Sequence, residues 1–174
     1  MDDRSVVGAQ LGRPTRSPVD VTVRCHLGLP IIVDVPPILD DGTPFPTTHW
    51  LSCPLAVVRI SRLESVGGVR TADALIREDS VTRLRFDEAM VRYRTERDRL
   101  IPADWDGPTP SGGVAGSSGG VKCLHAQYAD TAAGNANPIG EDVASRIEPL
   151  ACAAPCIIEV EGDAVTNPAW LEPQ

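Results

Sequence analysis

The sequence predicts a single α+β domain in which a small β-sheet is packed with three or four helices. A chain of 174 residues, 42% of them hydrophobic, has the size and composition of one globular domain. Segments with strand-like alternation come first, and segments with helical spacing of apolar residues follow them. The 16 prolines and 15 glycines also predict many loops between these elements.

The N-terminal part predicts a flexible arm and then two strands. Residues 1–18 are polar and show no hydrophobic period, which is typical of a flexible arm. Valines alternate with polar residues over 19–24, the pattern of a half-buried strand. The β-branched run over 29–35 predicts a second strand. Cys25 and His26 fall in the short connection between the two strands.

The middle of the chain predicts a packed loop and three helices. Residues 45–54 contain prolines and large aromatics, which favours an ordered loop. The first helix begins near Pro54, because proline is tolerated in a first turn, and it runs to about Ser65. A short helix begins at Thr71. A longer helix covers about 80–100, with an apolar stripe on one face and arginines facing water.

A glycine-rich loop precedes the helix of the C-terminal half. Residues 102–120 are rich in glycine and proline and are interpreted as an internal linker. Apolar residues then recur at helical spacing from Val121, and a Gly-Asn pair provides the stop. This pattern predicts that Lys122 and Cys123 lie in the first helical turn.

The domain is expected to cover residues 19–162 and to close with one more strand. Residues 135–140 are interpreted as a turn, and 156–160 as a strand of the same small sheet. The tail over 163–174 is expected to be irregular.

Charge and hydropathy exclude several function classes. The chain has 24 acidic and 16 basic side chains and a net charge of −8, with the acidity concentrated in the last third. No basic stripe is present, so nucleic-acid binding is not expected. No run of eighteen apolar residues and no signal-peptide pattern occur, so we expect a cytoplasmic protein without membrane insertion. The acidic third leaves open an adaptor that binds a basic protein partner.

Each histidine lies within four residues of a cysteine, in the pairs Cys25 with His26, His49 with Cys53, and Cys123 with His125. Five cysteines in a chain without an export signal favour free thiols or metal ligands over disulfides. Convergence of these pairs would make a mixed thiolate and imidazole site, which suits zinc. We therefore predict a zinc site with the ligands Cys25, Cys53, Cys123 and His125. The alternative is that the cysteines are buried as small apolar side chains.

The same region also allows a cysteine-dependent enzyme. The start of a helix beside a lysine stabilises a thiolate, so Cys123 would be the nucleophile. His125 or His49 would be its base. An anionic substrate would bind to a pocket made by Gly119, Gly120, Lys122 and Arg24.

Several short motifs follow one another between residues 23 and 142: Arg24-Cys25 with Gly28 and Pro30, DGTPFPT with Trp50-Leu51 and Cys53-Pro54, Ser61-Arg62-Leu63-Glu64, GGVKCLH, and Asn137-Pro138-Ile139-Gly140. Together they resemble the bacterial domain-of-unknown-function family 501 (DUF501). The resemblance implies an actinobacterial, cytoplasmic protein. Family members often lie near genes for a septum-formation initiator and an exopolyphosphatase, which implies a link to cell division, with a protein partner there, or to polyphosphate metabolism. It carries over no catalytic residue, and Cys152 and Cys156 lie outside it.

Overall fold

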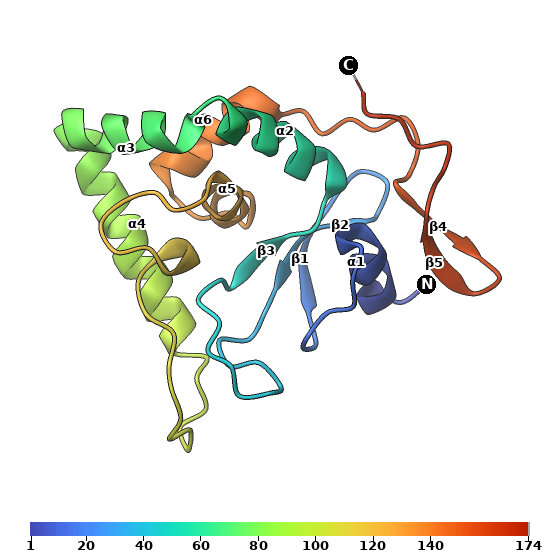
Figure 1. The fold of residues 1–174 in the computed structure, drawn as a ribbon, viewed down its shortest axis with the longest axis horizontal. Coiled ribbons are helices and arrows are strands. Elements are labelled where there is room, and N and C mark those ends of the chain that lie inside the picture. The colour runs from blue at the N-terminus through green and yellow to red at the C-terminus, as the bar shows by residue number, and fades with distance from the viewer. Residues whose placement is uncertain (174) are drawn as a thin grey trace.

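A three-stranded antiparallel sheet lies at the centre of the computed structural model, which describes residues 1–173 (Figure 1). Its strands are β1 (Asp20–Arg24), β2 (Pro30–Asp34) and β3 (His49–Leu51), in the order β1-β2-β3. The central strand β2 is almost wholly buried, whereas β1 alternates between exposed and half-buried residues, as an edge strand does. The two N-terminal strands are thus confirmed. The third replaces part of the predicted loop, because three residues are too few to show a period.

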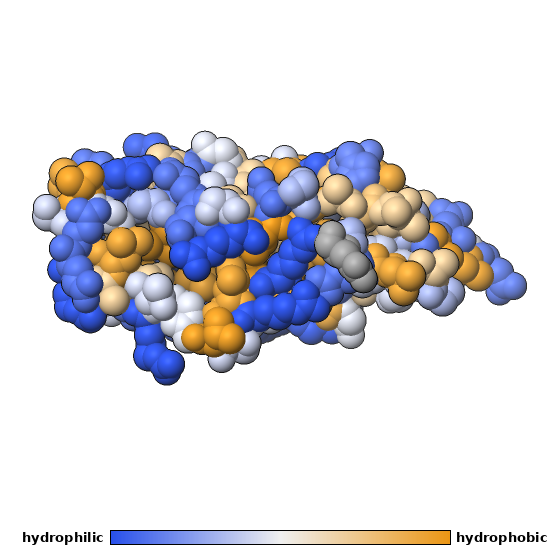
Figure 2. Space-filling model, turned by 90° about the horizontal axis from the view of Figure 1, so that it is seen from above, coloured by the Kyte–Doolittle hydropathy of each residue, from blue (hydrophilic) through white to orange (hydrophobic). Residues whose placement is uncertain are grey.

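Helices cover one side of this sheet (Figure 1). They are α2 (Pro54–Ser65), α3 (Gly68–Glu78), α4 (Ser80–Asp98), the short 3-10 helix η1 (Val114–Gly116), α5 (Leu124–Ala132) and α6 (Pro138–Ile147). Helix α5 lies in the middle of them, in contact with α2, α6 and β3. Figure 2 shows the surface from the side of α2 and α3, where hydrophilic and hydrophobic side chains are interspersed. With α1, described below, residues 1–173 contain six α-helices, more than the three or four expected.

The main core joins the sheet to the helices. Its fully buried members come from β2, α2, α4, α5 and α6 and include Ile32, Ile60, Phe86, Tyr128 and Ile139. Helix α5 buries six of its nine residues, because it is surrounded by other elements. The core therefore fixes the start of α5 against α2, which positions the site described below.

Two differences from the predicted helices follow from local geometry. Helix α3 begins at Gly68 rather than at Thr71, because Gly67 takes a positive φ of 92° and lets the chain turn directly from α2 into α3. Helix α6 begins at Pro138, within the turn predicted over 135–140, so only residues 135–137 stay outside a helix. Its N-cap is Asn137, whose side chain accepts hydrogen bonds from two backbone N–H groups of the first turn.

The N-terminal segment contains a helix that the sequence analysis did not predict. Helix α1 (Asp3–Leu11) is capped by Asp2, which accepts a hydrogen bond from the backbone N–H of Ser5, and it ends at Gly12 with a φ of 67°. Only Val6 and Val7 are buried, so its apolar face is too short to give a detectable period. Residues 3–11 are therefore a packed helix and not an irregular arm.

The C-terminal segment forms a separate hairpin of β4 (Ile157–Val160) and β5 (Asp163–Thr166). A strand was correctly predicted at 156–160, but it pairs with β5 and not with the N-terminal sheet. The tail beyond residue 162 was expected to be irregular, yet it supplies β5. The hairpin packs against α1, at the end of the molecule where the N-terminus lies (Figure 1).

The glycine-rich linker is anchored at its second half. Arg97 of α4 is fully buried and donates hydrogen bonds to the backbone carbonyls of Pro110, Ser111 and Gly112. Val114 is also fully buried. Among residues 1–173, no helix is both long and apolar enough to cross a membrane.

Candidate functional site

Cys123 and His125 lie together at the start of α5. The predicted helix from Val121 begins three residues too early, because the structure begins α5 at Leu124. Cys123 is the N-cap residue and has an extended backbone with φ −158°. On a regular helix residues 123 and 125 would point to nearly opposite sides. The extended backbone removes this obstacle and places Sγ of Cys123 3.7 Å from Nδ1 of His125.

Glu64 of α2 is the third member of the site. One of its carboxylate oxygens, Oε1, lies 3.3 Å from Nδ1 of His125 and accepts a hydrogen bond of 2.6 Å from the backbone N–H of Leu124. The ligand atoms of Glu64, Cys123 and His125 all lie within 4.8 Å of one another. Glu64 is not among the predicted ligands, because no cysteine or histidine lies close to it in the sequence. The one feature of the sequence that could have indicated Glu64 as a site residue is its place in the motif Ser61-Arg62-Leu63-Glu64.

The other ring nitrogen of His125 determines its tautomer. Nε2 lies 3.2 Å from the backbone carbonyl oxygen of Val57 and 3.3 Å from Oγ of Ser61. A carbonyl oxygen can only accept, so Nε2 carries a hydrogen and donates it. In a neutral His125 the lone pair of Nδ1 then faces the thiol of Cys123 and the carboxylate of Glu64. A lone pair facing a carboxylate oxygen is favourable only when a proton or a metal ion lies between them.

The charges around His125 favour a cation at this place. Burial lowers the pKa of His125, but the hydrogen bond and charge of Cys123 and the charge of Glu64 outweigh burial and raise the pKa above its usual value. The side chains of His125 and Glu64 are both about three-quarters buried, at 23% and 27% exposed, so solvent screens these interactions only in part. The site thus attracts either a second proton on His125 or a metal ion.

A cavity of about 440 Å³ lies beside this group. Cys123 and His125 form part of its wall, and His49 and Trp50 of β3 form another part. Most of the remaining wall is apolar and includes Leu51, Val57 and Ala126. The structure therefore brings the three predicted catalytic residues, Cys123, His125 and His49, to one cavity.

His49 is held in place through both ring nitrogens. Nδ1 lies 2.7 Å from a carboxylate oxygen of Asp34, and Nε2 lies 3.3 Å from the side-chain nitrogen of Asn135. Because an amide nitrogen can only donate, Nε2 accepts and Nδ1 carries the hydrogen. His49 also packs edge-on against Tyr93, with ring centroids 5.8 Å apart. A histidine with both nitrogens engaged serves better as a positioned polar group than as a free base.

One member of the predicted anion pocket, Arg24, is already bound to other groups of the chain. The guanidinium of Arg24 forms an ion pair of 2.6 Å with Asp3 of α1 and a hydrogen bond with the backbone carbonyl of Gly28. Lys122 is exposed on the surface. The ion pair therefore engages the guanidinium of Arg24 with α1, and an anion would have to compete with Asp3 for it.

The chain's own carboxylates occupy the backbone donors at the start of α5. The N–H of Val121 donates to Asp73 at 2.7 Å, and the N–H of Leu124 donates to Glu64 at 2.6 Å. The start of a helix attracts negative charge, and here the charge comes from two neighbouring helices, α3 with Asp73 and α2 with Glu64. Glu64 therefore takes the place where the sequence analysis expected a bound anion.

Four cysteines lie apart from this site, in a region that we call the four-thiol group: Cys25, Cys53, Cys152 and Cys156. Burial raises the pKa of Cys53 to about 11, and the nearby thiols of Cys156 and Cys152 add to the increase. Burial likewise raises the pKa of Cys156, with contributions from Cys152 and Cys25. All four are free thiols.

The predicted zinc ligands are thus divided between two places. In the part of the chain that the structure describes, Glu64, Cys123 and His125 form the one cluster of three or more His, Cys, Asp or Glu side chains close enough to share an ion. Cys25 and Cys53 are not in it. Cys53 caps α2 at the end opposite Glu64 and packs into the main core.

Comparison with known proteins gives one match. A family model described as "Protein of unknown function (DUF501)" matches residues 21–145. The matched region contains all three members of the Glu64, Cys123 and His125 cluster and both residues of the Asp34–His49 pair. It leaves out Cys152 and Cys156. No curated protein and no solved structure matches the chain.

Proposed function

The chain belongs to the DUF501 family, and we propose that in it Glu64, Cys123 and His125 bind one zinc ion that activates water against a small substrate held in the adjacent cavity. The observation that carries the proposal is the set of groups that surround the two ring nitrogens of His125. Its Nε2–H donates to the carbonyl of Val57, which leaves Nδ1 facing a thiol and a carboxylate. A metal ion between these three groups would satisfy all of them at once.

The donor set favours zinc over other common divalent ions. A thiolate, an imidazole and a carboxylate together suit a borderline-soft ion, whereas magnesium and calcium prefer oxygen ligands alone. Two of the three ligands also have a partner that orients them. Val57 and Ser61 hold the ring of His125, and the N–H of Leu124 holds the carboxylate of Glu64. Such outer partners are the usual support of a protein metal site.

The number of ligands points to a catalytic rather than a structural site. Structural zinc sites usually have four protein ligands, and catalytic ones have three and a place for water. Zinc in such a place supplies a water of lowered pKa. Cys123 and His125 line the cavity, so a substrate could approach from that side. The apolar wall would exclude bulk water, and His49, held by Asp34 and Asn135, provides a positioned polar group for a substrate.

A cysteine-dependent enzyme is the second candidate, and the separation of 3.7 Å between Sγ of Cys123 and Nδ1 of His125 favours it. In this alternative His125 is protonated at both nitrogens, consistent with its raised pKa, and forms an ion pair with the thiolate of Cys123. Glu64 then stabilises the imidazolium. His49 would be a positioning residue and not the base, since Asp34 and Asn135 engage both of its nitrogens.

Elemental analysis of the full chain, purified without a histidine tag under reducing conditions, tests the proposal. We expect close to one zinc per chain, and less than about a tenth of that in Cys123→Ser and in Glu64→Gln, because each removes one of three ligands. Cys152→Ser is the matched control and should keep its zinc. The zinc proposal is refuted if the wild-type protein contains no metal and takes up no zinc on dialysis. If Cys123 is then alkylated much faster than the other thiols, the cysteine-dependent enzyme is supported instead.

A further inference from the structure

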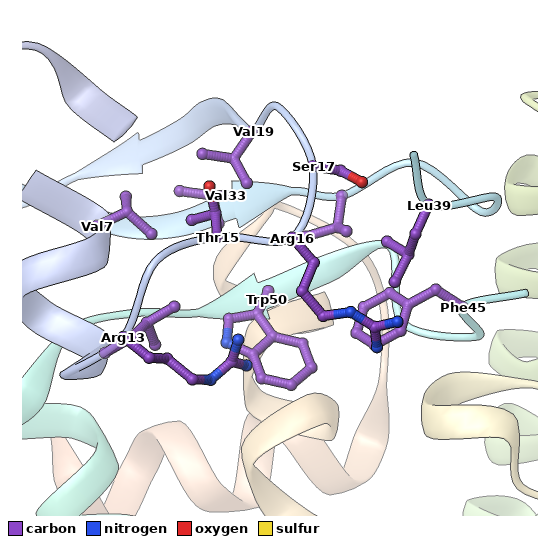
Figure 3. Close-up of a pocket in the computed structure, with 12 residues that line it drawn as sticks. Val7, Arg13, Thr15, Arg16, Ser17, Val19, Val33, Leu39, Phe45 and Trp50 are labelled. Atoms are coloured by element: carbon purple, nitrogen blue, oxygen red, sulfur yellow. The ribbon is translucent and has the colours of Figure 1, made fainter. Parts of the chain in front are cut away.

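A second pocket lies between the segment that follows α1 and the three-stranded sheet (Figure 3). Its inner wall is apolar and includes Val7 and Val33, both almost completely buried. Phe45 and Trp50 form an aromatic side, with ring centroids 5.3 Å apart. The pocket has about 80 Å³ of free space, which is room for a short alkyl chain or for the inner part of one ring.

Two arginines stand at the rim of this pocket. Figure 3 shows the side chains of Arg13 and Arg16 extending toward the rings of Trp50 and Phe45. Arg16 is bound to Asp41 by an ion pair of 2.6 Å. Within residues 1–173, no ion pair or hydrogen bond holds the guanidinium of Arg13. A free guanidinium at an apolar pocket is notable in a chain whose net charge is −8.

The combination selects a particular kind of ligand. An apolar wall gains from burying carbon, while an arginine at its edge pairs with a carboxylate or a phosphate. An inorganic anion would use only the arginines, and a neutral ring would use only the wall. A ligand that carries both features would use the whole pocket.

We propose that this pocket, which we call the arginine pocket, binds a small ligand with an aromatic or aliphatic body and one carboxylate or phosphate group. The body lies against Trp50 and Phe45, and the anionic group pairs with Arg13, with Arg16 beside it.

The arginine pocket also adjoins the site cavity. Leu11 and Trp50 line both spaces, so the two lie on either side of these residues. A longer ligand anchored at Arg13 could therefore extend toward Cys123, which would make the arginine pocket the part of the active site that selects an anionic substrate. This link to catalysis rests on the proposed function, whereas ligand binding at Arg13 does not.

NMR of the indole N–H signals tests binding directly, because Trp50 lines the pocket and a Trp50→Phe variant identifies its signal among the three tryptophans. The probes are phenyl phosphate, inorganic phosphate and benzyl alcohol. We expect phenyl phosphate to shift the Trp50 signal and to bind at least about tenfold more tightly than either of the other two. Equal affinity for benzyl alcohol or for inorganic phosphate would overturn the proposal.

Variants locate the anionic group. The double variant Arg13→Gln, Arg16→Gln should weaken phenyl phosphate about tenfold or more and leave benzyl alcohol unchanged. Both side chains are exposed, so the fold should tolerate the change. Arg94→Gln, an exposed arginine of α4, is the matched control and should bind as the wild type does.

Cys123→Ser separates this inference from the proposed function. Binding of phenyl phosphate that persists in Cys123→Ser and is lost in the double arginine variant supports the arginine pocket, whether or not the wild type contains zinc. The reverse pattern, in which binding is lost in Cys123→Ser and kept in the arginine variant, would place the phosphate at the metal site and refute the arginine pocket.

Discussion

The two cysteine regions of this protein differ in what surrounds the sulfur atoms. Cys123 is half-buried beside an imidazole and near a carboxylate, at the wall of a cavity. The four-thiol group lies among apolar side chains, where burial raises the pKa of Cys53 to about 11 and also raises that of Cys156. The comparison teaches that a nearby histidine in the sequence does not make a thiol a ligand. What decides whether a thiol could bind a metal is the set of polar groups that tertiary packing brings to it.

Helix α2 separates the two regions. Cys53 is its N-cap and Glu64 lies in its last turn, eleven positions further on, which corresponds to about 16 Å along a helix axis. A short separation in the sequence does not show which residues share a site. His49 lies four positions before Cys53, yet its ring binds Asp34 and Asn135. The strand β3 directs His49 to the cavity, and the helix start directs Cys53 into the core.

Removal of the metal should give the largest difference between the two regions. If zinc is bound, a strong chelator should lower the free energy of unfolding by about 3 kcal/mol or more, as loss of a ligand present at a hundred times its Kd would do. Thermal unfolding followed by circular dichroism with and without chelator measures this. Cys123→Ser, which lacks a ligand, should show no chelator effect. A chelator effect of equal size in Cys123→Ser would contradict the proposed site and would indicate that the metal is bound by the four-thiol group.

Truncation of one thiol in each region should affect different properties. Cys53→Ala removes a buried sulfur from the core and should lower the free energy of unfolding by about 1–2 kcal/mol without changing the zinc content. Cys123→Ala should abolish zinc binding. Denaturant unfolding and elemental analysis of both variants provide the comparison, and loss of zinc in Cys53→Ala would show that the regions are coupled.

Alkylation should distinguish the thiols kinetically. Because the pKa of Cys53 is about 11, only about one thousandth of it is thiolate at pH 8, and its burial restricts access further. In metal-free protein we expect iodoacetamide to modify Cys123 at least about a hundredfold faster than Cys53, as measured by peptide mass spectrometry over time. Similar rates at pH 8 would mean that the surroundings of Cys53 are less apolar than the structure indicates.

The smallest effect concerns the pH dependence of stability in the metal-free protein. The folded-state pKa of His125 is raised above 6.5, its ordinary value. Its contribution to stability is therefore fully present below that value and is lost as the pH rises through the folded-state pKa. We expect the unfolding midpoint to fall over this interval in the wild type and to fall less in His125→Gln. An equal pH dependence in both proteins would assign the effect to other groups.

Local patterns were sufficient for the elements with a clear period. The amphipathic stripe predicted α4, the proline at Pro54 predicted the start of α2, and the alternating valines predicted β1. They were insufficient for α1 and β3, since each places too few apolar residues on one side to form a pattern. Local patterns also did not identify the strand that pairs with β4, because strand pairing depends on contacts between separate segments.

The sequence by itself determined the α+β class, the family, and the position of Cys123 and His125 beside a glycine-rich loop at the start of a helix. Only the tertiary structure decided which groups meet there. The packing of α5 against α2 brings Glu64 to His125 and leaves Cys25 and Cys53 elsewhere, and the segment after α1 places Arg13 beside Trp50. The physical reason is that periodicity reports short-range backbone preference, whereas a site is made by side chains whose distance depends on the packing of the whole core.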